Sequence, residues 1–349
     1  GCAMAPSTPE GTLPYERFDT TSEKPERRLE AFREAMSVMY DVQPLDEAAR
    51  LAPVIVDSWQ LGSSVLIAAQ MPAYSYERSS HMIARDGRDL YQIQLYQAGQ
   101  CHVVRGAKEA LAKPGDIMVT DLATPIFTEE PAFRHIDLLL PRALLSPLLD
   151  DPDAHGGRIL SGNHPLVALL GSHLESLHQQ AWRIPLERAM AVLSATAQLA
   201  ASAINGCSDE RTETGVNAAR ACELRRYINL HLLDPDLTPE SLAQRFGLSR
   251  ATVYRMFGAE NGLTRYVKRR RLERARIDLS SPSHRHRTIA EIGEAIGYAH
   301  AQDFIRAFRR EFGTSPGELR EQARTVGRIR LLGKTPQLPA WSEWVRRIS

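Results

Sequence analysis

The residues whose types and spacing point most directly to chemistry are polar side chains at the start of one predicted helix. His300, Ala301, Gln302 and Arg306 lie there, within a stripe of phenylalanines. An arginine presents two parallel N–H donors that match a guanine edge in the major groove of DNA, and a glutamine can pair with adenine. We therefore expect these four residues to be base-contact candidates on a DNA-reading helix.

A second segment, about fifty residues earlier, carries the same kinds of side chain. Its base-contact candidates are Arg250, Ala251, Thr252, Tyr254 and Arg255. Other basic residues could bind phosphates, which supplies affinity without sequence information. These phosphate candidates are Arg265, Lys268, Arg269, Arg270, Arg271, Arg309 and Arg310. For any single one of them, a solvated or ion-paired helix face is the alternative interpretation.

The elements that must position these residues are two similar helix-turn-helix units, at residues 238–260 and 288–312. In each, a threonine that can cap a helix opens a short amphipathic stretch, and Gly247 or Gly297 follows where a helix must stop and reverse. The second helix then has apolar residues four positions apart, which in the later unit are Phe304, Phe308 and Phe312. One face of that helix is predicted to enter a core while the others stay free.

Charge and a connecting helix support a DNA-binding module. Residues 217–320 hold 19 Lys and Arg against 12 Asp and Glu, whereas the whole chain has a net charge of only +1. Residues 263–279 are predicted to form one helix between the two units. Such a spacer would hold two recognition helices roughly 34 Å apart, which is one turn of duplex. The expected partner is double-stranded DNA with tandem half-sites.

Short motifs run through this basic part of the chain. They are Ile289-Ala290-Glu291-Ile292, Gly297-Tyr298, Phe304, Arg306, Phe308, Phe312-Gly313-Thr314-Ser315-Pro316 and Arg320. On these motifs, residues 217–322 resemble the DNA-binding domain of the AraC/XylS family of bacterial transcription regulators. Gly293 departs from the pattern, because the family usually has alanine there. The resemblance implies an all-α domain with two helix-turn-helix units joined by a long helix, and contact with RNA polymerase.

The N-terminal part has the pattern of short β-strands. Between residues 54 and 140, apolar runs are separated by Gly, Pro or Asp, which is typical of a sheet or barrel. This part resembles the cupin-like sensor domain of many AraC/XylS regulators at Arg85, Gly99, Pro114-Gly115-Asp116, Asp121 and Leu140-Pro141-Arg142. The resemblance implies an unknown small-molecule effector in the barrel. The candidate pocket residues are Arg85, Tyr91, Ile93 and Leu95, with ordinary core as the alternative for the last three.

The expected fold is α+β with two domains: an N-terminal cupin-like β-barrel with a helical dimerisation segment, and a C-terminal all-α domain. The expected parts are a disordered or tag-derived N-terminus (1–17), a sensor barrel (18–145), a helical segment (146–205), a linker (206–216), the DNA-binding domain (217–322) and a tail (323–349). The apolar face of the helical segment could be covered by the barrel or by a second subunit, and we favour a homodimer. The tail carries Trp341 and Trp344 and could pack on the protein, bind DNA or contact polymerase.

Other classes of protein find little support in the sequence. A cupin-type metal enzyme needs two or three histidines with a carboxylate at close spacing, but His81, His102 and His135 fall one per segment. No nucleophile elbow, phosphate-binding loop or dinucleotide fingerprint is present. Four scattered cysteines suit reduced thiols, and no run of about 18 apolar residues could span a bilayer. We expect no enzyme activity, no metal, no cofactor and a cytoplasmic location.

The sequence therefore predicts a sequence-specific DNA-binding transcriptional regulator of the AraC/XylS type. The resemblance favours an activator that is controlled by an effector bound in the barrel. The sequence leaves open a regulator without a small-molecule ligand, either constitutive or controlled by a protein partner.

Overall fold

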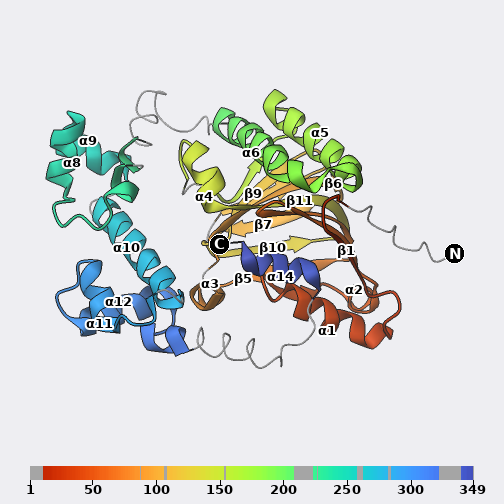
Figure 1. Ribbon diagram of the computed structural model, residues 1–349, viewed down its shortest axis with the longest axis horizontal. Coiled ribbons are helices and arrows are strands. Elements are labelled where there is room, and N and C mark those ends of the chain that lie inside the picture. The colour runs from red at the N-terminus through yellow and green to blue at the C-terminus, as the bar shows by residue number, and fades with distance from the viewer. Residues whose placement is uncertain are drawn as a thin grey trace. The chain divides into compact units, whose positions relative to one another are not determined.

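The computed structural model divides the chain into two compact units (Figure 1). Unit 1 comprises Gly1–Ser79, Arg88–Ser208 and Thr335–Ser349, and unit 2 comprises Ser80–Gly87 and Asp209–Lys334. The structure describes residues 11–86, 88–105, 108–152, 155–207, 223–225, 227–257, 262–281, 284–321 and 339–348, apart from the side chains of residues 84, 105, 108 and 255. Across these ranges, no helix is both long and apolar enough to cross a membrane.

Unit 1 is built on two antiparallel sheets. The larger sheet has the order β1 (Tyr15–Asp19), β3 (Ile55–Leu61), β4 (Ser64–Met71), β11 (Phe133–Pro141), β6 (Leu90–Ala98), β9 (Ile117–Asp121), β12 (Gly156–Leu160). The smaller sheet has the order β2 (Asp41–Pro44), β5 (Tyr74–Arg78), β10 (Ile126–Glu130), β7 (Cys101–Arg105), β8 (Lys108–Ala112). The predicted β-rich N-terminal domain is confirmed, and its hydrogen-bonded strands form two sheets instead of one closed barrel.

Each face of the larger sheet carries its own core. One core lies between the two sheets, where Ile67 of β4 and Tyr76 of β5 belong to the same cluster. The other lies beneath helices α5 (Pro165–Gln180) and α6 (Ala189–Gly206), where Leu174 and Leu193 join Ile93 of β6. Strands β6 and β11 are therefore buried along almost their whole length and do not alternate between buried and exposed. The sheet itself covers the apolar face of the predicted helical segment.

The other elements of unit 1 are short or lie at its rim. They are α1 (Pro25–Met36), α2 (Glu47–Leu51), α4 (Arg142–Leu145), α14 (Ala340–Arg347) and the single turns Ser146–Leu148, Ala181–Arg183 and Leu186–Arg188. Helix α14 comes from the predicted tail and lies beside α1 (Figure 1), where the Ser342 hydroxyl donates to the Ala35 carbonyl oxygen (3.0 Å). Strand β1 begins at Tyr15, inside the stretch predicted to be disordered or tag-derived.

Unit 2 contains the two predicted helix-turn-helix units. Its helices are α8 (Pro239–Phe246), α9 (Arg250–Met256), α10 (Gly262–Ser280), α11 (Ile289–Ala295), α12 (Ala301–Phe312) and α3 (Ser80–Asp86), and residues 316–321 are also helical. Residues 208–222, which include most of the predicted linker, lie outside the described part. Helix α3 was predicted to belong to the sensor, but it packs against α12 in unit 2.

Local sequence signals account for these helices and turns. Thr238 and Thr288 cap α8 and α11, each in a reciprocal pair with the residue three positions on, Ser241 or Glu291. Gly247 (φ 60°) and Gly297 (φ 95°) adopt the left-handed backbone that the reversal requires. The two turns predicted at glycine are confirmed.

Helix α10 connects the two cores of unit 2. Leu263 and Val267 near its start pack with the first helix-turn-helix unit, and Leu272 and Leu279 pack with the second. The helix predicted at residues 263–279 is thus confirmed as a continuous element shared by both units.

Candidate DNA interface and ligand cavity

Helix α12 holds the predicted base-contact residues of the second unit on its exposed sides. Phe304, Phe308 and Phe312 are buried in the core that α12 shares with α10 and α11. His300, Gln302 and Arg306 are exposed, and Ala301 is partly exposed. The two phosphate candidates that follow, Arg309 and Arg310, are also exposed. The Arg306 side chain is 78% exposed, and its Nη2 lies 2.5 Å from Asp303 Oδ1. The helix is anchored by one face and presents cationic and polar groups on the others.

Helix α9 presents the candidates of the first unit. Val253 is buried, whereas Arg250 and Ala251 are exposed and Thr252 and Tyr254 are partly exposed. Arg250 Nη2 lies 2.7 Å from Glu240 Oε1 of α8. The side chain of Arg255 lies outside the described part of the structure. Helices α9 and α12 lie toward opposite ends of α10 (Figure 1), as expected for two recognition helices on a spacer.

The basic cluster on α10 divides into two kinds of residue. Arg265 and Lys268 are exposed, and Arg269 is partly exposed with an ion pair to Glu273 (3.3 Å). Arg270 donates to Asn229 Oδ1 (3.0 Å) and Glu273 Oε2 (2.5 Å). Arg271 donates to the carbonyl oxygens of Leu232 (2.8 Å) and Asp234 (3.0 Å). Arg270 and Arg271, predicted as phosphate contacts, therefore hold residues 229–234 against α10.

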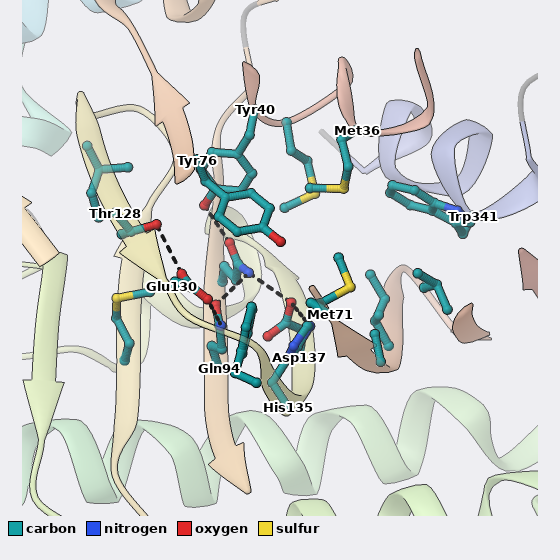
Figure 2. A pocket seen from close by; sticks show the side chains of 18 residues that line it. Met36, Tyr40, Met71, Tyr76, Gln94, Thr128, Glu130, His135, Asp137 and Trp341 are labelled. Atoms are coloured by element: carbon teal, nitrogen blue, oxygen red, sulfur yellow. Dashed lines mark hydrogen bonds and ion pairs between the residues drawn. The ribbon is translucent and has the colours of Figure 1, made fainter. Parts of the chain in front are cut away.

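Unit 1 contains a cavity between its two sheets (Figure 2). A volume of about 50 Å³ inside it is accessible to the centre of a water-sized sphere. Strands of both sheets, the end of α1 and helix α14 supply its walls. The lining side chains are Met36, Met39, Tyr40, Val56, Ile67, Ala69, Met71, Tyr76, Gln92, Gln94, Met118, Ile126, Thr128, Glu130, Phe133, His135, Asp137 and Trp341.

A buried chain of hydrogen bonds crosses one wall of this cavity (Figure 2). Tyr40 Oη donates to Gln92 Oε1 (2.5 Å), and Gln92 Nε2 donates to Asp137 Oδ2 (2.9 Å) and Gln94 Oε1 (3.1 Å). Gln94 Nε2 in turn donates to Glu130 Oε2 (3.5 Å). Two carboxyl groups are thus embedded in an otherwise largely apolar site.

The chain continues past Glu130 and Asp137 to neighbouring strands. The Thr128 hydroxyl and the Cys101 thiol both donate to Glu130 Oε1, at 3.0 Å and 3.4 Å. His135 Nε2 lies 3.4 Å from Asp137 Oδ2. Each carboxyl group therefore has partners on more than one strand.

Burial changes the protonation of these groups. Loss of hydration raises the pKa of Glu130 to about 7, above its usual value of 4.5. Burial disfavours a charged His135, but the Asp137 carboxylate outweighs this and raises the pKa of the imidazole. Near neutral pH the site can therefore hold an imidazolium paired with a carboxylate, beside a glutamate that is partly protonated.

Three buried polar atoms of the cavity lining have no hydrogen-bond partner among the described residues. They are Tyr76 Oη, His135 Nδ1 and Asp137 Oδ1. Buried polar atoms are paired in most native proteins, because an unpaired one costs about 1–3 kcal/mol. Unpaired groups that line a cavity are therefore suited to a polar ligand or to water.

The predicted pocket residues do not line this cavity. Tyr91, Ile93 and Leu95 point to the opposite face of β6, into the core beneath α5 and α6. Arg85 is an exposed residue of α3 in unit 2. The predicted residues of β6 are its apolar ones, whereas the two glutamines of this strand, Gln92 and Gln94, face the cavity.

The alternation of apolar residues and glutamines in β6 was the sequence signal that could have identified this wall of the cavity. Two glutamines inside a strand that is buried on both faces must have polar partners. The sequence alone did not show that both faces are buried, so Gln92 and Gln94 were passed over. Glu130, Asp137 and Trp341 were missed because nothing local brings β10, β11 and the tail together.

Two of the motif positions of the N-terminal domain are structural. Arg142 forms an ion pair with Asp121, and both side chains are buried. Arg142 also pairs with Asp89 and donates to Tyr91 Oη (2.6 Å). Because breaking such a buried pair leaves an uncompensated charge, both residues are needed for the fold of unit 1.

The histidines considered for a metal site are separated. His81 is exposed on α3, His102 lies 3.3 Å from Glu109, and His135 faces the cavity. Among the described residues, no group of three or more His, Cys, Asp or Glu side chains is arranged to hold a metal ion.

Comparison with known proteins agrees with this two-part organisation. Residues 242–322 match a family model described as a helix-turn-helix domain, and residues 40–205 match one described as an AraC-binding-like domain. Together the matches include strands β3 to β12, among them all strands that line the cavity, and all of α9 to α12.

Similar proteins include two activators of transcription. The transcriptional activator NphR of Rhodococcus sp is 28% identical over 268 residues, which is 73% of this chain and 77% of NphR. The HTH-type transcriptional activator RhaS of Escherichia fergusonii is 35% identical over 115 residues, 32% of this chain and 38% of RhaS.

A solved structure has a similar fold. The AraC-like transcriptional activator CuxR aligns with a TM-score of 0.52 and 24% identity, covering 74% of this chain and 95% of CuxR. The matched AraC-binding-like and helix-turn-helix domains, together with the two capped helix-turn-helix units on one connecting helix, show that the chain belongs to the AraC/XylS family of DNA-binding transcriptional regulators.

Proposed function

We propose that this regulator is a transcriptional activator that binds tandem half-sites through α9 and α12 and is controlled by a small molecule in the cavity of unit 1. The observation that carries the proposal is the cavity itself, which lies between the two sheets and contains unpaired buried polar atoms. A domain that served only as a scaffold would gain stability from filling such a space. The activating role rests on the names of the similar proteins.

The two recognition helices support reading of two adjacent major-groove faces. Each is held by buried apolar residues and has exposed polar ones, Arg250 on α9 and Gln302 and Arg306 on α12. Arginine and glutamine are the side chains that distinguish guanine and adenine in the major groove. Arg265, Lys268, Arg309 and Arg310 are exposed and supply phosphate contacts.

The proposal includes two protein partners. A second copy of the chain would double the number of half-sites, and RNA polymerase would be the target of activation. Exposed apolar side chains on the α5–α6 layer, Leu169, Leu186 and Met190, support a homodimer. Because its ligand is a bacterial operator, the protein is proposed to work in the bacterial cytoplasm, on the nucleoid.

Selection of bound sequences from a random DNA pool by the full chain tests the DNA part of the proposal. We expect two boxes about one helical turn apart, and a doubled pattern for the dimer. Binding without any enriched motif would contradict sequence-specific regulation and would favour an architectural role.

An effector screen tests the sensor part. All four tryptophans of the chain, Trp59, Trp182, Trp341 and Trp344, lie in unit 1, so their fluorescence reports on the sensor within the full protein. A true effector should change this fluorescence and shift the affinity for the selected operator by about fivefold or more. If no compound that binds unit 1 alters operator affinity, the regulator is constitutive or controlled by a protein partner.

A further inference from the structure

The cavity that the proposed function assigns to an effector has a definite chemical character. Its body is apolar and adaptable, with four methionines and the rings of Phe133 and Trp341. Its polar wall contains two carboxyl groups, Glu130 and Asp137, and Asp137 Oδ1 has no hydrogen-bond donor. The site can therefore accept hydrogen bonds from a ligand.

The described residues of the same lining include no cationic group for an anionic ligand apart from His135, which is already paired with Asp137. None of the described residues lining the cavity is Lys or Arg. Arg78, buried nearby in β5, donates instead to the carbonyl oxygens of Leu122 (2.5 Å) and Met39 (2.9 Å). His135 faces the Asp137 carboxylate, and Glu130 is a second acid in the same wall. A buried anion would meet acidic groups without a free cation to balance it.

We propose that the cavity binds small molecules with an apolar body and an uncharged or cationic head group that donates N–H or O–H hydrogen bonds, and that it discriminates against carboxylates and other anions. This proposal rests on the proposed control by an effector. Asp137 Oδ1 and the Glu130 carboxyl group receive the donors, and Tyr76 Oη and His135 Nδ1 are free to complete the contacts. Discrimination follows because a wrong head group leaves these buried atoms unpaired.

Matched probes with one apolar body test the class of ligand. Benzylamine, benzyl alcohol and benzoate, and the corresponding naphthylmethyl amine, alcohol and naphthoate, are titrated against the full chain by tryptophan fluorescence. We expect at least one amine or alcohol to bind at millimolar concentration, and its carboxylate partner to bind at least tenfold more weakly. Failure of all amines and alcohols, or equal binding of the carboxylates, would overturn the assignment.

Variants of the acidic wall connect the binding to the cavity. Asp137→Asn and Glu130→Gln should each weaken the amine by about tenfold, whereas Glu129→Gln, an exposed neighbour on β10, should leave it unchanged. If one cavity variant fails to fold, the other carries the comparison. A carboxylate that binds and also shifts operator affinity would refute this class of ligand while leaving the proposed function intact.

A second inference concerns helix α14, which forms one wall of the cavity (Figure 2). Trp341 is 1% exposed, yet its indole Nε1 has no hydrogen-bond partner among the described residues. The available volume of about 50 Å³ is enough for a few water molecules, since one needs roughly 10–15 Å³ on this measure. A ring-sized ligand requires one wall to move.

Helix α14 is a wall of the cavity that does not belong to a strand ladder. The cavity strands are paired in ladders within their sheets, and breaking them would expose many backbone groups. Hydrogen bonds that tie α14 to unit 1 are Trp341 N–H to Glu16 Oε2, Ser342 Oγ to the Ala35 carbonyl and Arg88 Nη1 to the Val345 carbonyl, each 3.0 Å. We infer that Trp341 acts as a plug that occupies part of the effector site and is displaced when an effector binds.

The chain connectivity gives this displacement a route to the DNA-binding unit. Residues 322–338 join α14 to the helix at residues 316–321, which follows α12 in unit 2. While α14 is bound in unit 1, the C-terminal side of unit 2 is tethered to the sensor. Release of α14 would remove this tether and change the conformations that unit 2 can adopt.

Indole, the ring of the Trp341 side chain itself, tests the plug without any assumption about the head group. We expect indole to bind the Trp341→Ala chain at least tenfold more tightly than the wild type, because the side chain no longer competes. Trp344→Ala, on the same helix but not in the cavity lining, is the matched control and should behave as the wild type. Equal affinity of wild type and Trp341→Ala, or no binding to either, would refute the plug.

Hydrogen exchange on the wild-type chain gives a second measurement that needs no variant. If indole displaces α14, amide exchange of residues 340–347 becomes faster at saturating indole. If Trp341 is only a fixed wall, exchange there becomes slower or stays the same, and the inference is wrong. This readout separates a plug from a wall even if Trp341→Ala does not fold.

Discussion

Arg306 is the residue at which DNA reading can be tested most directly. Its guanidinium is exposed and paired with Asp303 on the same helix, an exposed pair that contributes little to stability. The neighbouring arginines, Arg309 and Arg310, are exposed near the end of α12, and we propose that they contact phosphates. The arginines of α12 are thus expected to have different roles, one in reading bases and two in binding phosphates.

Arg306→Ala should cost about 1–3 kcal/mol on the selected operator and should relax the preference at one base position. Arg310→Ala should weaken binding to specific and random DNA alike. It should also reduce the slope of log affinity against log salt concentration by about one, because one fewer counterion is released. Fluorescence anisotropy on both kinds of DNA over a range of salt concentrations measures the two effects. Equal losses on specific and random DNA for Arg306→Ala would make Arg306 a phosphate contact.

Gly293 is a residue at which the general helix preference and the local packing disagree. Alanine is favoured over glycine in a helix by about 1 kcal/mol. A methyl group at Gly293 would, however, lie 2.8 Å from Cδ1 of the fully buried Phe304. In this chain, a methyl group at residue 293 would therefore require the Phe304 ring to shift.

Gly293→Ala should destabilise unit 2 by about 1–3 kcal/mol, because the methyl group would force a buried ring to shift. Gly317→Ala is the matched control, since its methyl group would make only an ordinary contact of 3.6 Å with Ile289. Urea unfolding followed by circular dichroism compares the two. A stabilised Gly293→Ala chain would show that Phe304 relaxes at little cost.

Glu130 is predicted to make the stability of unit 1 depend on pH. Its pKa is about 7 in the folded chain and near 4.5 when exposed, so the folded state binds the proton more tightly. Stability from this group is complete below about pH 4.5 and is lost as the pH rises to about 7. His135, whose folded pKa is also raised, acts in the same direction.

The Glu130→Gln chain should lose this dependence. Between pH 4.5 and pH 7 the wild type should lose up to about 3 kcal/mol relative to Glu130→Gln, from a shift of roughly two to three pKa units. Tryptophan-monitored urea unfolding across this range measures the difference, and Glu129→Gln is the control. Parallel pH curves for wild type and Glu130→Gln would show that the pKa of Glu130 is the same in the folded and unfolded states.

At the scale of elements, α10 combines support of the fold with the contact to DNA that we propose. Its apolar residues join the two cores of unit 2, and Arg271 binds the carbonyl oxygens of Leu232 and Asp234. Lys268 projects to solvent with its ammonium group 5.9 Å from the Tyr298 ring. The basic run on this helix is therefore not one uniform phosphate-binding surface.

Arg271→Ala should lower the free energy of unfolding of unit 2 by about 1–3 kcal/mol, because the carbonyl oxygens of Leu232 and Asp234 lose hydrogen bonds from a charged donor. Lys268→Ala should leave that stability within about 0.5 kcal/mol and lower DNA affinity instead. Urea unfolding and anisotropy titrations on both variants test the division. If Arg271→Ala loses DNA affinity without any loss of stability, Arg271 is a phosphate contact after all.

At the scale of the whole molecule, a homodimer would place two pairs of recognition helices on one operator. The α5–α6 layer shields the larger sheet within one chain, yet Leu169 is 58% exposed and Met190 is 53% exposed. Apolar side chains exposed on a helical layer that is already packed underneath suit a contact with a second copy.

Leu169→Glu and Met190→Glu together should convert the dimer to a monomer and halve the length of DNA protected from cleavage. Burying two carboxylates in an apolar interface costs several kcal/mol, enough to dissociate a moderate dimer. Sedimentation velocity measures the mass, and Leu230→Glu, an exposed leucine of unit 2, is the control. A wild-type chain that sediments as a monomer on and off DNA would refute the dimer.

The sequence by itself determined the DNA-binding unit. Thr238, Thr288, Gly247 and Gly297 carry local signals, and the phenylalanine stripe of α12 shows its buried face at a helical period. These signals act over a few residues, so they are visible without the rest of the molecule.

Only the tertiary structure decided the position of the cavity and the place of the tail. The alternation in β6 shows two faces but does not say which one lines a cavity when both are buried, so Tyr91, Ile93 and Leu95 were chosen over Gln92 and Gln94. Trp341 meets β4 across more than 250 residues of chain. Such contacts depend on how sheets and helices stack, which no local pattern of residues encodes.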